Sequence, residues 1–88
     1  MTVKELLKCI VCNVEVWKPI EGKKIWDFDR RCIEKVDLNE YNESEVYDYK
    51  FMTKDEYLEY IADTYFTDDM YTEKYGDEPV LVIIVKPE

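Results

Sequence analysis

Residues 79–87 read Pro-Val-Leu-Val-Ile-Ile-Val-Lys-Pro, and this stretch decides the fold of the chain. Its six consecutive apolar residues, 80–85, leave no face for water, whereas a half-exposed strand would alternate apolar with polar residues. A short, β-branched run between two prolines is typical of a strand covered on both faces. We therefore expect this strand to lie inside a sheet, with the rest of the chain packed around it.

The segments before this strand predict a single α+β domain over residues 1–88. In chain order they are a helix over 3–9, strands over 13–18 and 24–28 joined by a turn at 21–23, a helical turn or irregular strand within 29–36, a polar loop over 37–44, a strand over 45–52, and helices over 54–66 and 68–75. This order indicates a small mixed or antiparallel sheet of about four strands, with two or three helices mainly on one face and the C-terminal strand central. A helical crossover before the last strand permits parallel pairing.

Local signals support several of these elements. The pairs Thr2 with Glu5 and Thr53 with Glu56 have the spacing of a capping box, which begins a helix. Residues 13–18 alternate, so we expect a strand with one face of valines and one wet face that carries Glu15 and Trp17.

Composition restricts the function classes. The 88 residues carry a net charge of −9, without histidine, and the acidity is concentrated in residues 37–78, which contain fourteen Asp and Glu but three Lys. This charge argues against direct binding to nucleic acid or to an anionic membrane. No apolar run has the length of a membrane span, no export signal is recognisable, and three cysteines do not suit a disulfide framework, so we expect a protein of the cytoplasm.

The sequence carries no motif of a catalytic or metal site, so we expect neither an enzyme nor a cofactor. Cys9 and Cys12 have CxxC spacing, but only Cys32 is available as a third thiol, and small apolar residues at a helix–strand junction are the simpler interpretation. The acidic residues near 63–69 lack the alternating ligands and central glycine of a calcium loop.

Two surface features are candidates for binding. The first is the exposed face of the predicted helix over 54–66 together with the next helix, rich in carboxylates with tyrosines as anchors: Asp55, Glu56, Glu59, Tyr60, Asp63, Asp68, Asp69 and Tyr71. Carboxylates and tyrosines together suit a partner rich in Arg and Lys, and carboxylates on a rigid surface can imitate a phosphate backbone. The alternative is a solvated face that keeps a small domain soluble.

The second feature is a group that could hold an anionic small molecule such as a nucleotide, in a nucleotide-signal sponge: Trp17, Trp26, Arg30 and Arg31. The alternative is that the two arginines neutralise Asp27 and Asp29 at the surface. A third hypothesis is a structural protein whose exposed aromatic residues make a homo-oligomer.

The opening Met-Thr-Val-Lys-Glu-Leu-Leu, the stretch Val-Glu-Val at 14–16 and the closing Leu-Val-Ile-Ile-Val at 81–85 resemble small proteins of phages and mobile elements in Firmicutes. In size and charge the chain is also similar to small acidic phage inhibitors of host defence, including anti-CRISPR proteins that imitate DNA. The resemblance implies a non-enzymatic protein that binds a host protein with a basic surface and blocks it, without touching nucleic acid or a membrane itself.

Overall fold

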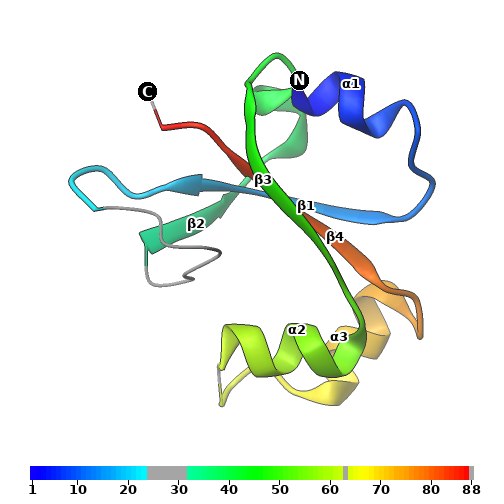
Figure 1. Cartoon of the computed structure of the whole chain (residues 1–88). Coiled ribbons are helices and arrows are strands. Elements are labelled where there is room, and N and C mark those ends of the chain that lie inside the picture. The colour runs from blue at the N-terminus through cyan, green and yellow to red at the C-terminus, as the bar shows by residue number, and fades with distance from the viewer. Residues whose placement is uncertain (24–31, 63, 88) are drawn as a thin grey trace.

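The computed structural model describes residues 1–23, 32–62 and 64–87 (Figure 1). Its elements are α1 (Val3–Leu7), β1 (Asn13–Pro19), β2 (Ile33–Val36), the 3₁₀ helix η2 (Leu38–Tyr41), β3 (Val46–Met52), α2 (Lys54–Ile61), α3 (Asp68–Tyr75) and β4 (Val80–Val85). The predicted strand over 24–28, which includes Trp26, lies outside the described residues. No helix within the described ranges is long and apolar enough to cross a membrane.

The four strands form one mixed sheet in the order β2-β1-β4-β3. β4 pairs in parallel with β1, where Val16 lies opposite Ile83, and antiparallel with β3, where Tyr49 lies opposite the same residue. β2 pairs antiparallel with the other side of β1. The central position of the C-terminal strand and the small α+β fold are therefore as predicted.

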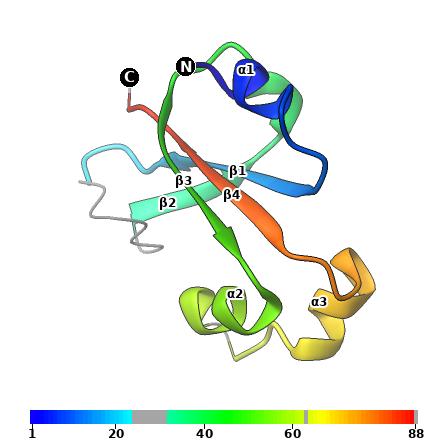
Figure 2. The same ribbon diagram turned by 45° about the vertical axis from the view of Figure 1, so that its right-hand side comes forward.

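Each face of β4 enters a different hydrophobic cluster, because successive side chains of a strand point to opposite faces. Val80, Val82 and Ile84 pack beneath α2 and α3, whereas Leu81, Ile83 and Val85 pack beneath α1. No β4 residue exposes more than 2% of its surface. Figure 2 shows α1 on one side of the sheet and α2 and α3 on the other, so the helices divide between the two faces.

The predicted wet face of β1 is wrong. Glu15 and Trp17 lie on the face that α2 and α3 cover, and they are 1% and 4% exposed. Pairing with β4 on one side and β2 on the other also places β1 inside the sheet. The alternation of polar and apolar residues in β1 therefore does not indicate a solvent-exposed face. Both faces of the strand are covered, and Glu15 can be buried because it has polar partners inside the protein.

Helix boundaries differ from the prediction where the stop signal is weak. α1 ends at Leu7 instead of residue 9, and α2 ends at Ile61 instead of residue 66. Ala62 adopts a left-handed conformation (φ 47°) that terminates α2 although neither glycine nor proline is there. α3 has the predicted bounds, since Thr67 caps its start and Gly76 follows its end.

The ambiguous stretch before residue 37 resolves as a strand over Ile33–Val36, and the predicted polar loop after it contains the 3₁₀ helix Leu38–Tyr41. The strand over 45–52 begins at Val46, with an irregular register between Val46 and Asp48. Its exposed side chains include Tyr47, Tyr49 and Phe51.

Candidate functional site

The outer surface of α2 and α3 carries a group of exposed carboxylates, which we call the acidic helical layer: Asp55, Glu56, Glu59, Asp68, Asp69 and Glu73. The two helices lie next to each other over one face of the sheet (Figures 1 and 2). The six side chains are exposed, so they lie on the outer side of this helical pair. Five of the predicted partner-binding acids are therefore brought together. Asp63, the sixth, lies outside the described residues.

Local interactions fix both helices at their first turns. Thr53 accepts from the Glu56 backbone and the Glu56 carboxylate accepts from the Thr53 N–H, which completes the predicted capping box and lowers the pKa of Glu56. The Thr67 hydroxyl accepts from the Met70 N–H at the start of α3. Lys54 Nζ lies 2.8 Å from Asp68 Oδ1 and so joins the start of α2 to the start of α3.

The predicted tyrosine anchors are not exposed rings. Tyr71 is 0% exposed, and its hydroxyl donates to the Glu78 carbonyl at 2.6 Å. Its assignment as a partner-binding anchor is therefore wrong, because the ring fills the core between α3 and the sheet. Tyr60 is half-buried and stacks on Trp17 with ring centroids 5.7 Å apart.

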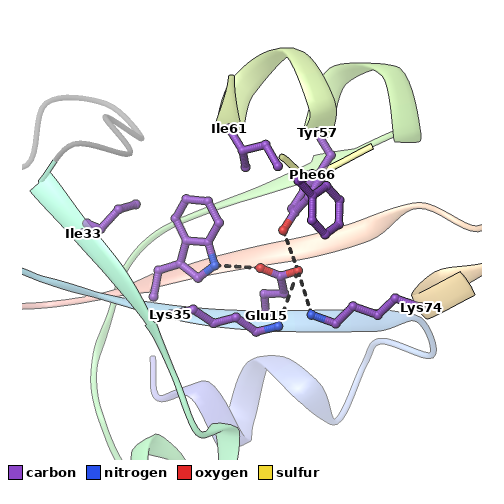
Figure 3. A pocket seen from close by; sticks show the side chains of 8 residues that line it. Glu15, Ile33, Lys35, Tyr57, Ile61, Phe66 and Lys74 are labelled. Carbon is purple, nitrogen blue, oxygen red and sulfur yellow. Dashed lines mark hydrogen bonds and ion pairs between the residues drawn. The ribbon is translucent and has the colours of Figure 1, made fainter. Parts of the chain in front are cut away.

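Beneath the acidic helical layer lies a buried carboxylate, Glu15 of β1 (Figure 3). Its Oε1 accepts from Trp17 Nε1 at 2.8 Å. Its Oε2 accepts from the Tyr57 hydroxyl of α2 at 2.8 Å and from the Tyr75 hydroxyl of α3. One oxygen atom therefore holds both helices to the sheet, and a buried charge has the hydrogen-bond donors that it requires.

Two lysines reach the same oxygen from opposite sides. Lys35 Nζ of β2 lies 3.8 Å from Glu15 Oε2, and Lys74 Nζ of α3 lies 3.9 Å from it. Figure 3 shows the two ammonium groups directed towards each other beside the carboxylate. Both lysine side chains remain almost half exposed, at 47% and 44%, so the cluster of Glu15, Lys35 and Lys74 opens to solvent.

A hollow of about 290 Å³ lies at this cluster. Its lining combines the three charged residues with apolar and aromatic side chains: Glu15, Trp17, Ile33, Lys35, Tyr57, Ile61, Phe66 and Lys74. The volume lies just below the range of about 300–1,000 Å³ that is common for small-molecule sites.

Burial and neighbouring charges shift the pKa values of two residues that contact Glu15, Tyr75 and Lys35. Burial raises the pKa of Tyr75, and the hydrogen bond to the negative Glu15 raises it further, so this hydroxyl stays protonated as a donor. Burial lowers the pKa of Lys35, as does the neighbouring Lys74, while Glu15 acts in the opposite direction.

Of the predicted ligand-binding residues, only Trp17 is described. It is buried and lines the hollow, whereas Trp26, Arg30 and Arg31 lie outside the described residues. Sequence reasoning missed Glu15, Lys35, Lys74 and Tyr75 as a group. The one available signal was a glutamate in the middle of an apolar strand, and its partners lie up to 60 positions away.

The three cysteines differ in exposure. Cys9 is exposed, and Cys12 and Cys32 are half-buried. Burial raises the pKa of Cys12, which suits a packed apolar side chain better than a reactive thiolate. Among residues 1–23, 32–62 and 64–87, no group of three or more Cys, Asp or Glu is arranged to hold a metal ion.

Fold and site together describe a small mixed-sheet α+β protein with a buried, hydrogen-bonded carboxylate and an acidic outer layer. No protein-family model, curated protein or solved structure matches this chain.

Proposed function

We propose that this chain is a non-enzymatic binding protein whose acidic helical layer engages a basic surface on a host protein and blocks it. The observation that carries the proposal is the placement of exposed carboxylates from α2 and α3 on one outer surface, over a core that holds both helices through Glu15. Fixed charges of one sign steer a basic partner towards the surface and set its orientation.

The lysines near the acidic helical layer are too few to neutralise its negative charge. Residues 53–78 contain nine Asp and Glu but only Lys54 and Lys74. Lys54 pairs with Asp68, and Lys74 turns towards Glu15 beneath the layer. The outer surface therefore retains a negative excess, which supports imitation of nucleic-acid charge and fits the resemblance to small acidic phage proteins.

A matched pair of charge-reversal variants tests the proposal. The first carries Asp55→Lys, Glu59→Lys and Asp69→Lys, which leaves the capping residue Glu56 and the bridging residue Asp68 intact. The control carries Glu21→Lys, Glu40→Lys and Glu43→Lys, three exposed acids away from the layer. Each tagged protein captures binding proteins from a bacterial lysate, and quantitative mass spectrometry compares them with the unaltered chain.

We expect at least one basic protein to be captured by the unaltered chain and by the control but depleted tenfold or more with the layer variant. Its affinity should also fall as salt rises from about 50 to about 500 mM, because exposed charges are screened. The proposal would be contradicted if both variants lost the captured protein equally, or if capture did not change with salt concentration.

Self-association is a second candidate, and one observation favours it. Tyr47, Tyr49 and Phe51 are each about half exposed along β3, which lies at one end of the described sheet. Such a row of aromatic side chains is typical of an interface. Light scattering on the unaltered chain and on a Tyr47→Ser, Tyr49→Ser, Phe51→Ser variant tests it; a monomeric mass for both at about 0.5 mM would remove this candidate.

A further inference from the structure

We propose that the hollow between β1, β2, α2 and α3 binds a small organic monoanion, such as an aromatic carboxylate, with the anionic group between Lys35 and Lys74. This site is separate from the acidic helical layer and does not depend on the function proposed for it. Its residues differ from those that the sequence indicated for a ligand, except for Trp17.

Positive charges outnumber negative charges among the residues that line the hollow. Two ammonium groups share one carboxylate oxygen, Glu15 Oε2, which already accepts hydrogen bonds from Tyr57 and Tyr75. At 3.8 and 3.9 Å, the two Nζ atoms lie beyond the usual hydrogen-bond distance from that oxygen. The cluster therefore has one positive charge in excess and N–H donors that a second anion can engage.

The lowered pKa of Lys35 agrees with this imbalance. Burial is its first cause and the neighbouring Lys74 is the second, so Glu15 does not fully compensate for two ammonium groups. An added anion would face both lysines at the half-exposed rim, where it keeps part of its hydration. It would therefore avoid the full cost of burying a charge.

The other residues that line the hollow favour a ligand with an apolar ring. Trp17, Ile33, Ile61 and Phe66 surround the cluster with aromatic and aliphatic surface. A hollow of about 290 Å³ with a few polar groups between apolar walls is small, so it admits only a compact ligand. A monoanion with one ring matches both the charge and the walls, whereas a bare inorganic anion matches only the charge.

The indole N–H of Trp17 gives a direct readout, since it donates to Glu15 inside the hollow. We would titrate ¹⁵N-labelled protein with benzoate, phenyl phosphate, inorganic phosphate and benzylamine at constant ionic strength, and assign the indole signal with a Trp17→Phe variant. Saturable shifts with millimolar or tighter affinity are expected for the two aromatic anions, weaker shifts for inorganic phosphate and none for benzylamine.

Three variants and a control locate the anion. Lys35→Gln and Lys74→Gln should each weaken binding of benzoate at least fivefold, Lys74→Arg should retain it, and Lys86→Gln, an equal change of charge at an exposed site, should leave it unchanged. Amide spectra verify that each variant is folded. The proposal is overturned if no anion gives a saturable shift at about 20 mM, if benzylamine binds more tightly than benzoate, or if Lys86→Gln weakens binding as much as Lys35→Gln.

Discussion

Glu15 of β1 contacts both α2 and α3 and joins these two helices to the sheet. It is 1% exposed, and three neutral donors from β1, α2 and α3 reach its two oxygens. A buried charge is costly unless it is paired and hydrogen-bonded, so each donor compensates for part of the desolvation. The same carboxylate also offsets the repulsion between Lys35 and Lys74, whose Nζ atoms both lie near its Oε2.

The substitution Glu15→Gln should therefore destabilise the protein by about 2–4 kcal/mol. The amide keeps the size of the side chain but removes the charge, and its NH₂ group has to face either the indole N–H of Trp17 or the hydroxyl and ammonium donors. Urea unfolding measures the change, with Glu34→Gln as the exposed control on β2. A loss for Glu15→Gln no greater than that of the control would show that the cluster does not stabilise the fold.

Tyr71 and Tyr75 predict a loss of stability at alkaline pH. Burial raises the pKa of both hydroxyls above the value of about 10 that an unfolded chain has. A raised pKa means that the folded state holds its protons more tightly, so the stabilisation is complete below about pH 10 and is lost as pH rises from there towards the folded-state pKa.

The free energy of unfolding, followed from about pH 8 to about pH 11.5, should thus fall above about pH 10. The absorbance of tyrosinate near 295 nm should show some tyrosines ionising only together with unfolding. Tyr75→Phe should make the decline less steep, while Tyr47→Phe, an exposed change, should not. A decline that is identical in Tyr75→Phe and the unaltered chain would refute this assignment.

At the level of elements, the best predictions rest on signals within the element. Six apolar residues in a row predict a strand buried on both faces, and β4 is central. Thr67 and Gly76 bracket α3 at the predicted bounds. The missed features depend on contacts distant in sequence: Glu15 has the local pattern of a solvent-facing residue, and two of its hydrogen-bond donors are hydroxyls 42 and 60 positions later.

The end of α2 is the clearest missed boundary. An apolar stripe continues past Ile61 in the sequence, and alanine is the best helix former, so nothing local marks the stop. Ala62 nevertheless has φ 47°, and its N–H donates to the Leu58 carbonyl at 3.2 Å in a cap that usually carries glycine.

Ala62→Gly should consequently stabilise the protein by about 0.5–1 kcal/mol, because glycine adopts the left-handed conformation without the clash that a β-carbon causes. A rise in the melting temperature of about 2–6 °C is expected. Glu59→Gly in the interior of the same helix should have the opposite effect and lower stability by about 1 kcal/mol. A lower melting temperature for Ala62→Gly would show that α2 ends for another reason.

At the scale of the whole molecule, the acidic surface and the exposed aromatic surface lie on different elements. α2 and α3 cover one face of the sheet and carry the acidic helical layer, while α1 covers the other face, with aromatic side chains exposed along β3. The acidic segment and most of its residues could be predicted from the sequence. The buried position of Tyr71 could not, because a tyrosine on an amphipathic helix has the same local pattern whether it packs inward or outward.

Hydrogen–deuterium exchange on the complex with the partner isolated by capture tests the role of the layer most directly. If the acidic helical layer is the binding surface, the partner should slow amide exchange in α2 and α3, over Lys54–Ile61 and Asp68–Tyr75, and leave α1 and β3 unchanged. Protection confined to α1 or β3, with α2 and α3 exchanging as in the free protein, would contradict it.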